Sequence, residues 1–217
     1  GAGTWYVIPT ANAPSARGWH GAVWAGDKMI VWGGTDDPSN SSMNDGGIWT
    51  PDGAGGAWSS TAMTTHDYRH RHEAVWTGTE MIVWGGVDGS ASPGELNTGG
   101  VYDPLDGPGG SWRATSTVNA PSARQRHTMK WTGSKVVVWG GYTAADQSMD
   151  TGGVFTPDAS AGSWSQIPTV GAPEGRSKHT MVSTGSQVVV WGGDTVGAKL
   201  ETGAVLDLHG EGPVAVR

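Results

Sequence analysis

Short apolar runs of strand length recur along the chain, and glycine follows each of the most regular ones. These are four-residue runs of Met, Ile or Val that end in Trp, at residues 29–32, 81–84, 136–139 and 188–191. Such β-branched runs favour strands that are buried on both faces. No segment carries apolar positions at a helical spacing of 3.6 residues. The pattern therefore predicts an all-β protein.

Each of these runs is one strand of a repeating unit of about 50 residues. Val-Trp-Gly-Gly occurs four times, at Trp32, Trp84, Trp139 and Trp191. A shorter run and a glycine turn precede it, which is a hairpin signal. A loop and a third run follow, and then a glycine-rich segment with a second repeated tryptophan, which is Trp5, Trp58, Trp112 or Trp164. The unit predicts four antiparallel strands.

The repeats also share an Arg-x-x-His element before the first strand. From Pro121 to Trp164 the order is Pro-x-x-Arg-x-x-His, Gly, Val-Trp-Gly-Gly, an aromatic-Thr-Pro, and Trp. This order resembles the kelch repeat, in the bacterial type where Trp precedes the glycine pair. The resemblance implies one β-propeller domain over residues 1–217, made of four kelch-like four-stranded blades. The implied blades are residues 17–62, 69–117, 124–169, and 176–217 together with 4–10.

The fourth unit ends before its own outer strand, whereas Trp5-Tyr6-Val7-Ile8 is an outer strand without a unit. We therefore expect the N-terminal strand to complete the last blade and close the ring, because closure removes open strand edges. Two alternatives remain. Several chains share a larger ring or exchange this strand, as a homo-oligomer or strand-swapped assembly, or the four units are part of a longer propeller.

Composition narrows the classes of partner. The net charge is −7 and no basic run occurs, so we expect no nucleic-acid partner. No apolar stretch is long enough to span a membrane. There is no cysteine, so disulfides and thiol chemistry are excluded. No signal peptide is visible, but the resemblance implies an extracellular or periplasmic protein.

The repeated histidines are the first candidates for chemistry, since one stands before the first strand of each unit. We expect a structural role for them within each unit, with a metal site around the axis as the alternative. The repeated arginines are expected to tie backbone or acidic groups of neighbouring units. The histidines concerned are His20, His72, His127 and His179.

Variable positions are the second group of candidates, because function on a repeat scaffold tends to lie where repeats differ. Trp19 departs from the repeat, and an exposed tryptophan suits a ligand or a protein hot spot. Asp88, Glu95 and Asp146 lie in the loops between second and third strands. These four residues are the predicted ligand-binding positions.

No enzymatic signature is present, and no cofactor or catalytic residue is predicted. The favoured function is a non-catalytic binding or assembly module that recognises a protein or a carbohydrate through its loops. The alternative is a small-molecule enzyme, such as a sugar mutarotase or epimerase, that uses the axial pocket. Whether the chain is an enzyme stays open at this point.

Overall fold

The computed structural model describes residues 3–36, 41–53, 55–63, 68–91, 94–145 and 147–208. Strands and loops make up this part of the chain, and no helix occurs in it. No helix long and apolar enough to cross a membrane is therefore found among these residues. The prediction of an all-β protein is confirmed.

Three sheets have four antiparallel strands each, in the order in which the strands follow along the chain. The first has β1 (Gly21–Trp24), β2 (Met29–Trp32), β3 (Gly46–Thr50) and β4 (Ala57–Ser60). The second has β5 (Glu73–Trp76), β6 (Met81–Trp84), β7 (Gly99–Asp103) and β8 (Ser111–Ala114). The third has β9 (Thr128–Trp131), β10 (Val136–Trp139), β11 (Gly152–Thr156) and β12 (Ser163–Gln166).

The fourth sheet has three strands among the described residues. These are β13 (Thr180–Ser183), β14 (Gln187–Trp191) and β17 (Gly203–Asp207). A small hairpin of β15 (Asp194–Thr195) and β16 (Ala198–Lys199) projects from the loop between β14 and β17. The edge of β17 that faces away from β14 therefore pairs with no described strand.

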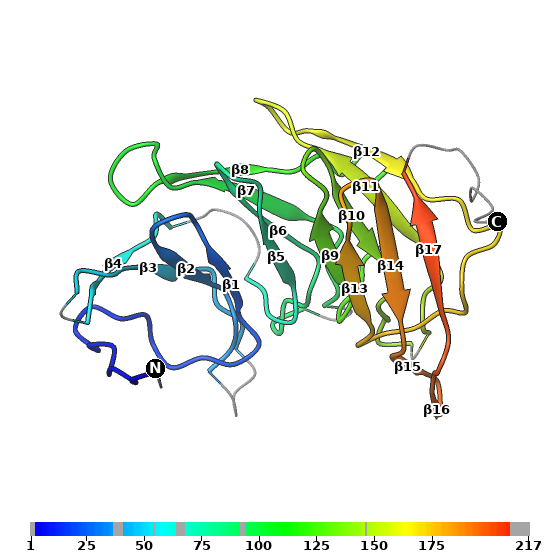
Figure 1. Ribbon diagram of the computed structural model, residues 1–217, viewed down its shortest axis with the longest axis horizontal. Helices are drawn as coiled ribbons and strands as arrows, with labels where there is room; N and C mark the ends of the chain where they lie inside the picture. The colour runs from blue at the N-terminus through cyan, green and yellow to red at the C-terminus, as the bar shows by residue number, and fades with distance from the viewer. Residues whose placement is uncertain are drawn as a thin grey trace.

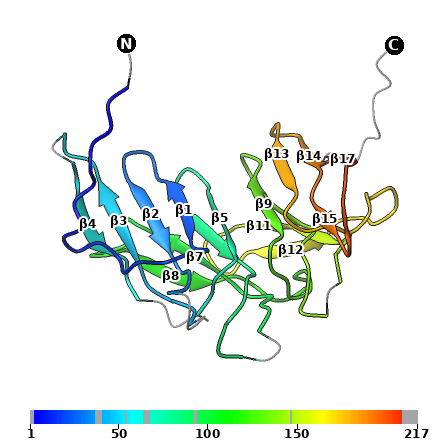
Figure 2. The ribbon, with the colours of Figure 1, turned by 90° about the horizontal axis from the view of Figure 1, so that it is seen from below.

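The sheets follow one another in a row, and the first strands β1, β5, β9 and β13 are neighbours along it (Figure 1). The first and fourth sheets lie at opposite ends of this row (Figure 1). Seen from below, β4 of the first sheet and β17 of the fourth sheet also lie on opposite sides (Figure 2). Over the described residues the structure is thus an open arc of four sheets and not a closed ring.

The predicted closure by residues 4–10 is not observed. Residues 3–10 form no strand, and the Trp5 side chain is 96% exposed. Tyr6, Val7 and Ile8 lie beside Trp49 of the first sheet and not beside β17. The physical reason is the open arc, because β17 lies at the far end of the row from the N-terminal segment.

Tryptophans fill the spaces between neighbouring sheets. The outer-strand Trp112 packs on Trp32 of the preceding sheet with ring centroids 4.8 Å apart, and Trp164 packs on Trp84 at 5.3 Å. Within each sheet the repeated arginine binds backbone carbonyls. For example, Arg124 donates to Gly140 O at 2.9 Å and to Thr151 O at 2.7 Å. The arginine side chains thus tie the strands of one unit, which differs from expectation. The arginine backbone does join neighbouring units, since Gly141 N of the third unit donates to Arg176 O of the fourth at 2.8 Å.

Candidate functional site

A pocket of about 550 Å³ opens at the start of the first strands of all four sheets, and we call it the inner pocket. The segments between the repeated arginine and the first strand supply its walls. Each of the four units contributes to it. It is lined by Trp19, His20, Arg71, His72, Glu73, Arg126, His127, Thr128, Lys178 and His179.

The residue two positions after each repeated arginine has left-handed backbone. The φ angles are 52°, 54°, 54° and 53° at Trp19, Arg71, Arg126 and Lys178. Backbone hydrogen bonds join these residues from sheet to sheet, since Arg71 N donates to Trp19 O at 3.0 Å and Lys178 N to Arg126 O at 3.1 Å. A non-glycine residue at positive φ is uncommon and is often associated with a functional site. The repeat thus holds four equivalent side chains around one pocket.

Three of these four side chains are cationic. The Arg71 guanidinium lies 4.1 Å from the centroid of the Trp19 ring, a cation–π arrangement. The Arg126 guanidinium lies 5.3 Å from the ring of Tyr142. Lys178 Nζ is 3.1 Å from Asp194. The pocket is therefore locally basic although the whole chain is acidic.

Glu73 is the acidic residue of the inner pocket, at the first position of β5. Burial raises the pKa of the Glu73 carboxyl from 4.5 to about 7, and the charge of Lys130 opposes this shift only in part. The carboxyl therefore exchanges a proton near neutral pH. Sequence analysis missed it. The sequence did contain a signal. Glu73 is the only acidic residue at the position directly after the repeated histidine, where the other units have Gly21, Thr128 and Thr180.

Three of the four repeated histidines are buried and uncharged at neutral pH. Burial is the main cause that lowers the pKa of His127 to about 3 and that of His179 to about 4, and it lowers the pKa of His72 well below 6.5. Each ring meets a tryptophan of the preceding sheet edge-on, for example His127 on Trp84 at 5.3 Å. His20, which has no preceding sheet, is exposed.

The metal alternative has no geometric support in the described part of the chain. Within those ranges no three His, Asp or Glu side chains converge as metal ligands. The imidazoles of His72, His127 and His179 instead contact tryptophans, and His179 Nε2 also lies 2.6 Å from Thr128 Oγ1. In this structure the rings of His72, His127 and His179 therefore pack between neighbouring sheets.

The structure brings two of the predicted ligand-binding residues into one network. Glu95 accepts a hydrogen bond from Gln125 at 2.9 Å, and Gln125 accepts one from Arg71, which stacks on Trp19. Asp88 lies outside the pocket, where it caps its own turn by accepting from Ser90 N and Oγ.

Asp146 lies outside the described residues. Three pocket cations were not among the predicted positions. They are Arg71, Arg126 and Lys178. Their shared place in the repeat was the signal that could have found them.

No protein-family model matches the chain. A curated relative, the tRNA wybutosine-synthesizing protein 2/3/4 of Arabidopsis thaliana, is 40% identical over 87 residues, which are 39% of this chain. The chain spans 8% of that relative's length.

This similarity overturns the predicted function. The relative is named as a tRNA wybutosine-synthesizing protein, and not as a module that binds or assembles proteins or carbohydrates. The prediction of a binding or assembly module for proteins or carbohydrates, with a sugar mutarotase as its alternative, is therefore wrong. It rested on the absence of short catalytic motifs, and a site made from single residues of separate repeats leaves no such motif.

Proposed function

We propose that this chain acts in tRNA modification, with the inner pocket receiving a phosphate of the RNA and Glu73 exchanging a proton with a neighbouring group of the RNA. One observation carries the proposal. Arg71, Arg126 and Lys178 surround a pocket that also contains a carboxyl whose pKa is about 7. The name of the Arabidopsis relative supports tRNA as the class of substrate.

The chemistry of these groups suits an RNA phosphate. Guanidinium groups bind phosphate oxygens through paired, charge-assisted hydrogen bonds. An acid–base group is most effective when its pKa lies near the working pH, which burial achieves for Glu73. Perturbed carboxyls in clefts are candidates for functional sites for this reason.

The proposal replaces two sequence-based expectations. The expectation of no nucleic-acid partner came from the net charge of −7, whereas binding depends on the local charge of the contacting surface. A tRNA substrate would also place the protein inside a cell and not outside it. We retain the kelch-like propeller as a proposal for the fold family, supported by the repeated residues and by the sheets that follow one another in an arc.

Titration of labelled tRNA at several salt concentrations tests the pocket. Arg126→Gln should weaken binding about tenfold and reduce the salt slope by about one, because one phosphate contact is lost. Lys135→Gln, which removes the same charge from the turn between β9 and β10, is the matched control and should change neither quantity. Absence of tRNA binding at low salt, or equal effects of the two variants, would overturn the proposal.

The pH dependence of the same titration tests Glu73. Protonation removes a negative charge beside the bound phosphate, so tRNA should bind more tightly as the pH falls through about 7. Glu73→Gln should bind with the affinity of the low-pH form at every pH between 6 and 8. A wild-type profile that is flat over this range would show that Glu73 does not face the RNA.

A further inference from the structure

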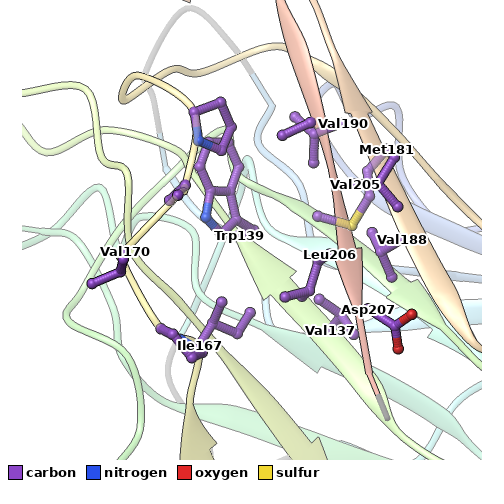
Figure 3. Close-up of a pocket in the computed structure, with 15 residues that line it drawn as sticks. Val137, Trp139, Ile167, Val170, Met181, Val188, Val190, Val205, Leu206 and Asp207 are labelled. Carbon is purple, nitrogen blue, oxygen red and sulfur yellow. The ribbon is translucent and has the colours of Figure 1, made fainter. Parts of the chain in front are cut away.

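The third and fourth units have two cavities between them. One is lined almost entirely by apolar side chains, such as Trp139 of the third sheet and Val188 and Leu206 of the fourth (Figure 3). The other adjoins the inner pocket and has a volume of about 340 Å³. A specific site needs polar groups that orient its ligand, and this second cavity has several. We call it the side cavity, and its lining includes Arg126, Tyr142, Ser148, Ser177, Lys178 and Asp194.

The residue directly after each repeated arginine determines how the corresponding space between the other units is filled. Between the first and second units this residue is His70, whose side chain is fully buried. Its ring stacks on Trp19 with centroids 5.7 Å apart, and its Nδ1 atom lies 2.8 Å from Ser42 Oγ. A side chain of the later unit thus contacts two residues of the earlier unit.

Gln125 has the same place between the second and third units, and it is also buried. Its Nε2 atom donates to Glu95 Oε1 at 2.9 Å, and its Oε1 atom accepts from Arg71 Nη1 at 3.1 Å. Glu95 is the counterpart of Ser42, because each forms the β-bridge within the loop of its own unit. One amide therefore satisfies an acceptor and a donor of the preceding unit.

Ser177 has this place between the third and fourth units, and its side chain is too short to fill the space. The counterparts of Glu95 and Arg71 are here Ser148 and Arg126. Neither side chain forms a hydrogen bond within the described part of the chain, and both line the side cavity. The cavity is thus the space that the Gln125 amide fills one unit earlier.

Two cations connect the side cavity to the inner pocket. Arg126 and Lys178 line both spaces. The Arg126 guanidinium lies 5.3 Å from the centroid of the Tyr142 ring, which also lines the side cavity. Tyr142 is the only aromatic residue directly after a repeated glycine pair. A group in the side cavity therefore lies beside an aromatic ring and next to the space where we place a phosphate.

We infer that the side cavity binds one nucleobase, whose edge takes the place that the Gln125 amide has one unit earlier. A nucleobase edge presents an acceptor beside an N–H donor, as a carboxamide does. Arg126 donates to the acceptor, Ser148 Oγ accepts from the N–H group, and Tyr142 offers a face for stacking. A guanidinium has five N–H donors, so Arg126 can bind the base and the phosphate together. That the base belongs to an RNA rests on the proposed function.

Free uridine tests the side cavity without a phosphate. In an NMR titration uridine should give saturable shifts of the backbone amides of Tyr142, Ser148 and Ser177. The control ligand is 3-methyluridine, which keeps the ribose and the ring but has a methyl group in place of the N3 hydrogen. It should bind about tenfold more weakly, because Ser148 loses its donor. Absence of saturable shifts, or equal affinities for the two nucleosides, would overturn the inference.

Ser177→Gln gives a second measurement, since it should fill the cavity with the amide that the second and third units already contain. This variant should lose uridine binding, whereas Ser177→Ala, which leaves the cavity open, should bind as the wild type does. Uridine binding that survives in Ser177→Gln would contradict the inference. The same titrations with tRNA separate the two proposals. A protein that binds uridine but no tRNA supports the cavity and refutes the proposed function, and one that binds tRNA but no uridine does the reverse.

Discussion

At the scale of single residues, the buried histidines show how one repeated residue can serve two sheets. The His127 ring lies edge-on to Trp84, and a Cβ atom at Gly85 would lie 2.6 Å from its Cε1 atom. Burial, with the charges of Arg124 and His179, lowers the pKa of His127 to about 3. The fold therefore accepts only the neutral imidazole at ordinary pH.

This pKa predicts loss of stability in mild acid. The unfolded chain takes up a proton on this histidine below pH 6.5, but the folded chain does so only near pH 3, so stability falls as the pH falls between these values. His127→Gln should remove about one proton from the number taken up on unfolding. The free energy of unfolding should then change less steeply with pH, by ~1.4 kcal/mol per pH unit. His20→Gln, at the exposed equivalent position, is the matched control.

The measurement is the free energy of unfolding by denaturant from pH 4 to 7. Glu73 acts in the opposite direction, since its raised pKa makes stability fall as the pH rises from 4.5 towards 7. All proteins compared should therefore carry Glu73→Gln. Equal slopes for the two histidine variants would contradict the burial of His127.

At the scale of the elements, the glycine pair after each second strand makes close contact between sheets possible. Gly140 has φ of +70°, and a Cβ atom there would lie 2.5 Å from His179 and 2.7 Å from Arg176 O. Gly192 has nearly the same backbone, with φ of +68°, but within the described residues a Cβ atom there would meet only Leu200 O, at 3.7 Å. A comparison of substitutions at Gly140 and Gly192 therefore distinguishes the cost of backbone strain, which both share, from the cost of overpacking, which arises only at Gly140.

Alanine at both positions should therefore have unequal effects. Gly192→Ala should cost about 1–2 kcal/mol, from the left-handed backbone alone. Gly140→Ala should cost a further ~1–3 kcal/mol, because the neighbouring sheet must move. Denaturant unfolding of the two variants measures the difference. If Gly140→Ala is no worse than Gly192→Ala, the third and fourth sheets do not pack as described.

The strands were the part of the structure that the sequence could predict. The runs at residues 29–32, 81–84 and 136–139 are strands with those same bounds, because burial on both faces leaves a continuous apolar run. The hairpin of β15 and β16 was not expected. The other units have only single β-bridges at the same place, such as Thr35 with Ser42 and Val87 with Glu95, so no strand-like run marks it in the sequence. Glu73 was missed for a different reason, because its pKa depends on burial that no local pattern encodes.

At the scale of the whole molecule, the arc has two inner sheets and two end sheets. The inner sheets pack against a neighbour on both sides, but each end sheet packs on one side only. The exposed Trp191 marks the uncovered side of the fourth sheet. In repeat proteins the stability of a unit is approximately the sum of two contributions. One is the folding free energy of the unit itself, and the other is the free energy of its interfaces with the neighbouring units.

Local stability should therefore differ along the arc. Amides of β6 and β10 should exchange hydrogen at least about tenfold more slowly than those of β2 and β14, because one missing interface lowers the opening free energy of an end sheet by more than ~1.4 kcal/mol. Hydrogen exchange followed by mass spectrometry resolves the four sheets. Equal protection of all four sheets in dilute solution would indicate a closed ring in place of the open arc.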